Sequence, residues 1–401
     1  MVLPPQLSNP YPDGILLPPG SSLGDMTLVG DGIRGPIRSQ DDATPYEQTW
    51  TIGIQHQLPG NIVIDANYVG KKGTKLFFGG AQQRNFLGAQ IETYNADQIA
   101  ALKTYVPNPF YGILPGSSTL GGSPEVEAYQ LQLPFPQYTD VQGVAPPWAN
   151  SIYHAFQLKV EKRFSQGLQF LITYTNSKSI DNASVTHGGL EWLGGRISLQ
   201  DPNRRYLERS LSDWDMPQVL GITYVYDLPF GRGRAFGKNW NPFVEAVLGG
   251  WKTNGIWRFS SGQPLPLGLS GGISLPTYGG QRPNLTGTLE RNTGSDWRDR
   301  YFTNPDVVAV PEPNAIGNAP RNLGSVRSPG VNTANISVLK EFFMNKFREG
   351  MHLEFRAEFF NAFNHPQFGP PDTEFEGGNF GVVTEQQNDP REIQLALKFY
   401  W

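Results

Sequence analysis

Apolar and polar residues alternate with a period of two over long stretches of the chain. From Tyr46 onward, Trp50, Ile52 and Ile54 alternate with polar residues or glycine until the turn signal Pro59-Gly60-Asn61. This period predicts β-strands whose side chains point alternately to two faces, and paired segments predict hairpins. The predicted strand pairs are 46–58 with 62–68, 151–164 with 168–175, 217–228 with 250–262, and 332–343 with 351–363, and a last strand is 391–401.

Long segments rich in Gly, Pro, Asn and Ser separate these hairpins. They cover residues 73–150, 181–213, 263–330 and 364–388. Structureless loops of this length are uncommon in compact soluble domains. Short turns that alternate with long loops are typical of transmembrane β-barrels, in which the short turns are periplasmic and the long loops extracellular.

The chemistry of the predicted strands fits the same fold. One face carries mostly aliphatic and aromatic residues, and the other carries charged and amide residues. Aromatic residues near predicted strand ends would form interfacial girdles; they are Phe164, Tyr174, Tyr226, Phe230, Trp251, Phe342, Tyr400 and Trp401. A soluble β-sandwich is the alternative, but its strands usually have about 5–6 residues. We therefore predict an all-β, antiparallel transmembrane barrel portion whose apolar face contacts lipid.

Composition excludes several other classes. The 401 residues include 46 Gly and 34 Pro, only 17% are charged, and there is no Cys. Disulfide frameworks, zinc knuckles and Cys nucleophiles are therefore excluded. The net charge of −4 provides no basic field for nucleic acid. No apolar run is long enough for a transmembrane helix.

The number of strands is odd. Single-chain bacterial barrels have an even number, and closing about nine strands would place the first parallel to the last. Residues 1–45 are predicted as an irregular N-terminal segment or extracellular loop, and 46–401 as barrel. Met1–Gln6 has neither the basic start nor the apolar segment of a signal peptide. We expect the C-terminal part of a longer chain, seen alone as a curved sheet with two unpaired edges or a strained closure. A truncated gene, a wrong start codon and a split gene all remain open as explanations.

Several spaced motifs resemble one family. From about Thr44 to the C-terminus, the chain resembles the Oar-like TonB-dependent outer-membrane receptors. The motifs are Tyr226–Arg234 (YDLPFGRGR), Gly250–Lys252 (GWK), Ser261–Pro264 (SGQP), Arg282–Asn284 (RPN), Asn322–Gly324 (NLG), Glu354–Gly369 (EFRAEFFNAFNHPQFG) and Asp389–Lys398 (DPREIQLALK). The resemblance implies a regulatory-like N-terminal module, a plug that contacts TonB, and a barrel of about 22 strands with a plugged lumen. Nothing in this sequence matches the first two parts.

The last strand is a candidate assembly signal. Its alternating apolar residues end on an aromatic, a pattern that resembles the signal captured by the outer-membrane barrel assembly machinery. The candidate residues are Ile393, Leu395, Leu397, Phe399 and Trp401. Capture would proceed by β-augmentation, in which an exposed strand edge supplies backbone hydrogen bonds. The alternative is an ordinary last strand of a sheet.

Charged residues on the polar faces are candidates for the lumen. Glu354, Arg356 and Glu358 alternate with apolar residues, as do Lys159, Glu161 and Arg163. Pairing between neighbouring strands would offset their desolvation. Tryptophans in or beside the loops either stack on a ligand or connect loops to one another; they are Trp148, Trp192, Trp214, Trp240 and Trp297.

No motif supports catalysis or a cofactor. Gly231–Gly237 has the spacing G-x-G-x-x-x-G without a βαβ context, and a short helix is predicted at 243–248. Gly20–Gly24 matches G-x-S-x-G, but no strand precedes it. The histidines share no ligand spacing; they are His56, His154, His187, His352 and His365. We therefore predict no enzyme, no metal and no cofactor.

Three functions remain open from the sequence. The first is part of a TonB-dependent receptor in the outer membrane of a Gram-negative cell, contributing wall and loops for ligand import. Its partners would be lipid, the assembly machinery and, through a plug not present here, the TonB complex. The second is a passive porin-like or adhesive barrel, and the third is a secreted β-rich carbohydrate-binding protein. The transported ligand and its contact residues are not given by the sequence.

Overall fold

The computed structural model describes residues 28–35, 44–78, 81–116, 118–144, 146–184, 199–271, 281–312, 315–344 and 347–401. The chain divides into two compact units. One consists of Met1–Gly35 with Gln83–Gly143, and the other consists of Pro36–Gln82 with Val144–Trp401.

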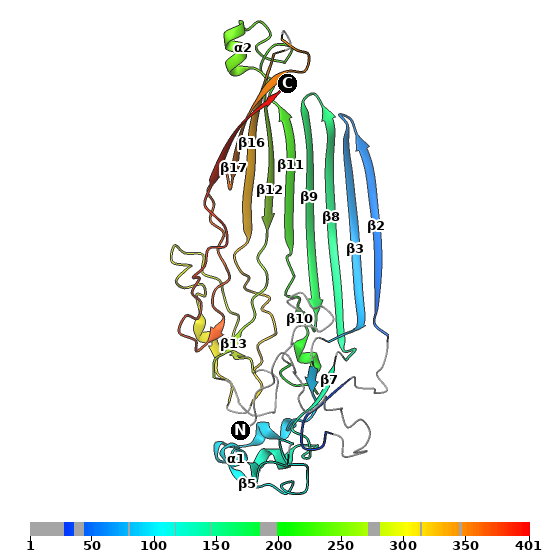
Figure 1. The fold of residues 1–401 in the computed structure, drawn as a ribbon, viewed down its shortest axis with the longest axis vertical. Helices are drawn as coiled ribbons and strands as arrows, with labels where there is room; N and C mark the ends of the chain where they lie inside the picture. The colour runs from blue at the N-terminus through cyan, green and yellow to red at the C-terminus, as the bar shows by residue number, and fades with distance from the viewer. Residues whose placement is uncertain are drawn as a thin grey trace, which may run out of the picture. The chain divides into compact units, whose positions relative to one another are not determined.

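The larger unit is built on one antiparallel sheet, in which each long strand lies beside its neighbours in sequence (Figure 1). In sequence order the long strands are β2 (Tyr46–Leu58), β3 (Ile62–Leu76), β8 (Ala149–Ser165), β9 (Leu168–Asp181), β11 (Gln218–Asp227), β12 (Trp251–Ser260), β16 (Val331–Phe343), β17 (His352–Phe360) and β19 (Glu392–Tyr400). The two-residue β10 (Ser210–Leu211) pairs with the end of β9. All nine long strands predicted from the sequence are thus present, and the all-β antiparallel prediction is confirmed.

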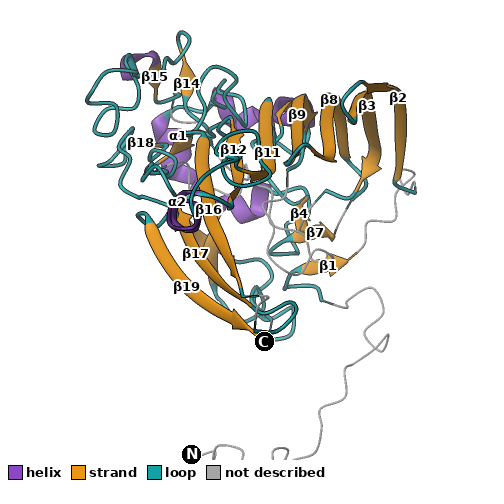
Figure 2. Ribbon diagram, turned by 90° about the horizontal axis from the view of Figure 1, so that it is seen from above, coloured by secondary structure: helices purple, strands orange, loops and turns teal. Residues whose placement is uncertain are grey.

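The sheet is open. Its strand order begins at β19 and ends at β2, and no pairing between these two strands occurs among the described residues. Seen from above, the strands follow one curved row with β2 and β19 at its ends (Figure 2). The expectation of a curved sheet with two unpaired edges is therefore confirmed.

Two connections are tight hairpin turns. Gly60 and Asn61 have φ values of 83° and 62°, and Gln166 and Gly167 have φ values of 52° and 79°. Two successive residues with positive φ define the type I′ turn, whose twist matches that of antiparallel strands. Glycine and asparagine adopt this backbone at low cost. The turns are therefore encoded locally, as the sequence predicted.

Some strands are longer than their apolar pattern. β9 continues beyond residue 175 to Asp181, because its polar end pairs with β8 and β10. Tyr174 therefore lies in the middle of β9 and not near a strand end, which corrects its assignment to an interfacial girdle. Backbone hydrogen bonds extend a strand without regard to side-chain hydropathy.

The connection between β11 and β12 is longer than a hairpin turn. It runs from Leu228 to Gly250 and contains α2 (Pro242–Leu248). The Asn241 side chain accepts a hydrogen bond from the Val244 amide, and Pro242 occupies the first turn, as is usual at a helix start. The predicted short helix is confirmed, but the rule that short turns alternate with long loops fails here.

The long loops contain the main hydrophobic core of the larger unit. Its buried residues are Leu265, Leu267, Leu289, Tyr301, Phe302, Val308, Ala319, Leu323, Val326 and Val383. The long loops also contain short elements, namely η5 (Arg205–Glu208), β13 (Gly268–Leu269), β14 (Asn284–Leu285), η6 (Pro305–Val307), β15 (Val308–Ala309) and β18 (Glu374–Phe375). The loops are therefore packed, although their composition predicts irregular polar segments.

The smaller unit has its own short elements. They are β1 (Ile33–Gly35), η2 (Ala89–Thr93), α1 (Ala96–Leu102), β5 (Tyr105–Pro107), β6 (Glu125–Glu127), η3 (Ala128–Gln132) and β7 (Val141–Val144), with β4 (Ala81–Gln83) at its boundary. Asn95 and Gln98 form a capping box at the start of α1. Of the predicted irregular segment 1–45, residues 1–27 and 36–43 lie outside the described residues.

Among the described residues, no helix is both long and apolar enough to cross a lipid bilayer.

Candidate functional site

One face of the nine-stranded sheet is apolar and exposed. The register places Ile54 opposite Ala66, Ala66 opposite Leu158 and Leu158 opposite Tyr174, so apolar residues of successive strands share this face. Ile52 and Ile54 are 72% and 76% exposed, and Leu395 and Leu397 at the other edge are 67% and 66% exposed. Contiguous exposed apolar surface of this kind marks an interaction with a membrane or a partner. We call it the apolar face.

The opposite face, here called the polar face, carries the predicted charged residues. Glu354, Arg356 and Glu358 lie there on β17, and Arg356 forms ion pairs with both carboxylates at 3.2 and 3.6 Å. Across the neighbouring strands, Lys252 contacts Glu341 at 2.9 Å. Charges of opposite sign thus compensate one another along this face.

A second ion pair lies on the polar face at β8. The Lys159 Nζ atom and a Glu161 carboxylate oxygen are 2.8 Å apart. Arg163, predicted to belong with them, lies where a register shift interrupts the pairing of β8 with β9. A hollow of about 430 Å³ lies beside this pair, lined in part by Glu161, Asn254 and three apolar side chains.

Those apolar side chains are Leu171, Val225 and Ile256. Ile256 is 59% exposed and lies on the polar face, opposite Thr223 and Asn335. The polar face is therefore not uniformly polar, and the sequence reasoning missed this patch. The signal was present as apolar residues on both faces of β9, β11 and β12.

Three arginines, one buried and two partly buried, connect two of the long loops. Arg282, Arg321 and Arg327 come from the loop between β12 and β16, and their carboxylate partners come from the end of β9 and the loop that follows it. We call this set the arginine clamp; its acidic members are Asp181, Glu208, Asp213 and Asp215.

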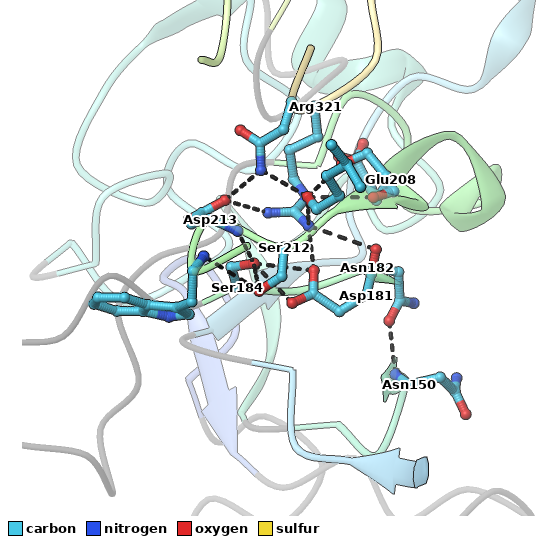
Figure 3. Close-up of polar contacts among 12 residues, drawn as sticks. Asn150, Asp181, Asn182, Ser184, Glu208, Ser212, Asp213 and Arg321 are labelled. Carbon is cyan, nitrogen blue, oxygen red and sulfur yellow. Dashed lines mark hydrogen bonds and ion pairs between the residues drawn. The ribbon is translucent and has the colours of Figure 1, made fainter. Parts of the chain in front are cut away.

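Arg321 lies at the centre of the clamp (Figure 3). It forms an ion pair with Asp181, and its Nη1 atom lies 2.7 Å from an Asp213 carboxylate oxygen. The Ser184 hydroxyl donates to Asp181 and accepts a hydrogen bond from the Asp213 amide at 2.9 Å. The Asn322 side chain also donates to Asp213. Each carboxylate is thus satisfied from within the chain.

The other two arginines are satisfied in the same way. Arg282 contacts Glu208 at 2.7 Å and donates to the carbonyl oxygens of Leu207 and Ala319. Arg327 contacts Asp215 at 2.6 Å, and Asp215 also accepts a hydrogen bond from the Ser179 amide in β9. Charge-assisted hydrogen bonds of this geometry are the strong class. The clamp thus joins the two loops to each other.

Sequence reasoning noted parts of the clamp only as motif residues. Arg282 and Asn322 fall in two of the quoted motifs, but their partners lie far away in the chain. No local spacing connects them. The charges of the two segments are nearly balanced, with four acidic and three basic residues in 201–215, so the sequence carried no signal for the clamp.

A second polar cluster explains the motif that follows β17. Asn361 and Asn364 have φ values of 47° and 51°, a backbone conformation that asparagine tolerates better than most residues. The Asn361 side chain accepts a hydrogen bond from the His365 amide and donates to the carbonyl of Asp389. Gln367 donates to the Asn332 carbonyl at 2.7 Å. The motif therefore joins the ends of β16, β17 and β19.

The hydroxyl of Tyr301 is buried in the loop core. It donates to the Arg327 carbonyl oxygen at 2.5 Å. Burial raises the pKa of Tyr301 to about 12, and nearby Arg291 opposes this shift. This residue joins the loop core directly to the arginine clamp.

The proposed assembly residues lie on the edge strand β19. Ile393, Leu395, Leu397 and Phe399 pair in register with Phe359, Ala357, Phe355 and Leu353, so all share the apolar face. Trp401 follows the strand, is 79% exposed and stacks with Phe399 at 5.9 Å between ring centroids. In the described part of the chain β19 pairs with β17 alone.

The tryptophans of the loops differ in surroundings. Trp148 is buried beneath Arg205, and Trp297 packs against Tyr301 and Phe368. These two connect loop segments, whereas Trp214 is 49% exposed. Trp240 lies half-buried in the β11–β12 connection. Trp192 lies outside the described residues.

The remaining sequence candidates form no chemical site. Gly231–Gly237 lies in the β11–β12 connection, where the Gly231 amide donates to the Phe236 carbonyl and the Phe236 amide donates to the Pro229 carbonyl. Gly20–Gly24 and His187 lie outside the described residues. Within the described ranges, no group of three His, Cys, Asp or Glu residues is placed to hold a metal ion.

A search of the curated proteins gave no match. Among solved structures, the outer membrane transporter YddB from Escherichia coli aligns with a TM-score of 0.43 and 11% identity over 93% of this chain and 36% of that one. P. aeruginosa FpvA, bound to a heterologous pyoverdine–iron complex, aligns at 0.33 with 10% identity over 88% and 26%. FpvAI in complex with pyocin S2 aligns at 0.34 with 10% identity over 88% and 27%.

This chain therefore spans about a third of the length of the first of these proteins and about a quarter of the others. The sequence over residues 4–394 matches the family described as "Outer membrane beta barrel domain". That match covers nearly the whole chain and agrees with its antiparallel meander and exposed apolar face. The chain belongs to the outer membrane beta barrel domain family.

Proposed function

We propose that the chain forms part of the wall and loop vestibule of a TonB-dependent outer-membrane receptor that imports a ligand. The observation that carries the proposal is the difference between the two faces of the sheet. Ile52, Ile54 and Leu395 are largely exposed on the apolar face, while Arg356 and its carboxylate partners lie on the other. Lipid outside and water inside a barrel are the surroundings that suit these faces.

The loops support a receptor more than a simple pore. The loop core excludes water from residues such as Tyr301 and Leu289, and the arginine clamp joins two loops through buried ion pairs. Loops on a rigid scaffold are where binding residues commonly lie. A fixed loop arrangement is what a selective vestibule requires.

Coupling to TonB rests on the sequence resemblance to the Oar-like receptors. In this proposal, TonB pulls on a plug segment that lies outside these residues. The nearest alternative is a passive porin-like or adhesive barrel, for which the same wall would serve. A soluble carbohydrate-binding protein would have to keep the exposed isoleucines and leucines of the apolar face in water, at a cost of about 25 cal/mol per Å² of apolar surface.

Two measurements test the proposal. The first is cell fractionation with gel migration before and after heating; we expect the protein in the outer-membrane fraction, with migration that changes on heating. Recovery of the protein in the aqueous phase without detergent would overturn the proposal that the sheet is part of a membrane wall.

The second measurement concerns TonB. The genomic DNA upstream of Met1 should encode an in-frame plug, and the product of the complete gene should crosslink to the periplasmic domain of TonB. An outer-membrane protein without either property would be a passive or adhesive barrel.

A further inference from the structure

Helix α2 turns its apolar side outward. Phe243, Val247 and Leu248 are 78%, 51% and 54% exposed. Its only charged residue, Glu245, points back into the connection, where its carboxylate accepts a hydrogen bond from the Arg232 amide at 2.9 Å. A surface helix in water has the reverse arrangement, with charged residues outside.

A lysine attaches this helix to the apolar face. Lys340 of β16 pairs in register with Trp251 and Phe355, so it lies on the apolar face, yet it is only 3% exposed. Its ammonium donates to the main-chain carbonyl oxygens of Glu245 and Gly249. These carbonyls lie at the C-terminal end of α2, where the last carbonyl oxygens of a helix lack intrahelical donors and a cation is favoured.

Trp251 makes a second attachment. Its indole N–H donates to the Val247 carbonyl oxygen at 2.9 Å. The Lys340 ammonium lies 5.4 Å from the Trp251 ring centroid. The last turn of α2 is therefore held against the side of the sheet on which Trp251 and Phe355 lie, at the end where the short turns occur (Figure 1).

Another lysine lies on the apolar face near a short turn. Lys162 pairs in register with Ile62 and Phe170, and its ammonium donates to the Gly60 carbonyl and the Ser165 hydroxyl at 2.9 and 2.6 Å. Lysines near a membrane boundary extend their charged ends toward polar groups in this way. Both ammonium groups thus lie toward the short-turn end of the apolar face and donate to polar groups there.

The charges of the β11–β12 connection suit an anionic surface. Between Leu228 and Gly250 there are three basic residues and one acidic residue, a net charge of +2. Arg232 and Lys238 are exposed, whereas the acidic Glu245 is partly covered. Basic residues that flank an exposed apolar helix are typical of helices lying in the headgroup region of a bilayer.

We propose that α2 is an interfacial anchor, lying in the headgroup region of the leaflet next to the short turns with Phe243 and Val247 among the acyl chains. Lys340 would hold it at that depth. The proposal rests on the proposed membrane wall, and it adds a specific lipid contact outside the sheet. The partner of the exposed side of α2 is phospholipid, because α2 continues the apolar face and has basic residues beside it.

The absence of cysteine from the sequence permits a clean test. Single cysteines at Ala246 on α2, at Leu395 on the apolar face and at Asn239 in the same connection would each carry a nitroxide label. The full chain is reconstituted in vesicles of phosphatidylethanolamine and phosphatidylglycerol. Two quantities are measured for each label: its accessibility to oxygen, which concentrates in lipid, and its accessibility to a water-soluble nickel chelate.

We expect the Ala246→Cys label to favour oxygen over nickel severalfold more than the Asn239→Cys label. An Ala246→Cys label as accessible to nickel as Asn239→Cys, with the Leu395→Cys label in lipid, would overturn the anchor and leave the wall intact. If the labels at Ala246 and Leu395 were both in water, the interfacial anchor and the membrane wall would both be overturned.

Lys340→Met tests the attachment. It keeps an apolar side chain on the face but removes the donor to Gly249 and Glu245. We expect the Ala246→Cys label to become more mobile and its oxygen preference to fall, while the Leu395→Cys label stays unchanged. An unchanged Ala246→Cys label in this variant would overturn the role of Lys340.

Discussion

Arg282 and Glu208 form a buried ion pair at 2.7 Å although they are 74 residues apart in the chain. Each comes from a different long loop, and the second carboxylate oxygen of Glu208 accepts a hydrogen bond from the Gln200 amide. Two loops that look unstructured by composition are thus joined by one of the most buried polar contacts in the larger unit.

Arg282→Met should loosen both loops. Removal of one partner from a buried ion pair leaves an uncompensated charge and costs about 3–5 kcal/mol. A loss of this size in the free energy of local opening corresponds to cleavage that is about a hundredfold to several thousandfold faster when opening precedes proteolysis. Digestion with chymotrypsin in detergent would measure it.

Arg348→Met is the matched control, because Arg348 lies exposed between β16 and β17. Its cleavage rate should equal that of the unchanged protein. If Arg282→Met and Arg348→Met were cleaved equally slowly, the clamp would not hold the loops.

A charge on the apolar face should destabilise the protein only in a bilayer. Leu395→Arg places a guanidinium near the middle of β19 on that face, and its expected cost is about 2–4 kcal/mol if the position faces the lipid midplane. Gln394→Arg, one residue earlier and on the polar face opposite Glu358, should change stability little. Reversible unfolding from phospholipid vesicles would compare the two, and equal stabilities would argue against lipid contact.

The buried Tyr301 should make stability depend on alkaline pH. Its pKa is about 12 in the folded chain, against an ordinary value of 10.0, so the folded state holds the proton more tightly. The stabilisation is present below pH 10 and is lost as the pH rises toward 12, by roughly 2–3 kcal/mol in total.

Subtraction of the tyrosinate absorbance of Tyr301→Phe from that of the unchanged protein would isolate this group. The difference should titrate with a midpoint near 12. A midpoint near 10 would show that the hydroxyl is in contact with water and that the loop core is more open than described.

Trp401→Ala should slow insertion by the barrel assembly machinery. The proposed signal combines the free edge of β19 with aromatic and aliphatic residues on its apolar face, so the loss of the terminal indole removes a recognition contact but no backbone hydrogen bond. Tyr400→Ala is the control, because the register places Tyr400 on the polar face opposite His352, which corrects its assignment to an interfacial girdle. Insertion into membranes that contain purified machinery would be measured, and equal rates for the two variants would argue against a signal at Trp401.

The alternation of residues was sufficient to locate the nine long strands and to separate the two faces of the sheet, except at the apolar patch around Ile256. Successive side chains of a strand point to opposite faces of the sheet. The apolar residues Ile393, Leu395 and Leu397 can therefore be assigned to one face from the sequence, before the neighbouring strand is known. The tight turns at Gly60-Asn61 and Gln166-Gly167 were equally local, because positive φ angles depend on the residues that adopt them.

Only the tertiary structure revealed how the loops and the end of the sheet are held. Arg321 and Asp181 are 140 residues apart, and Lys340 meets the carbonyl of Gly249 across 91 residues. Ion pairs and hydrogen bonds act over a few ångströms, and their energy depends on burial that no local pattern contains. The sequence therefore determined where the strands and tight turns lie and which way most strand side chains point. The packing of distant segments against each other determined the arginine clamp, the loop core and the position of α2 against the sheet.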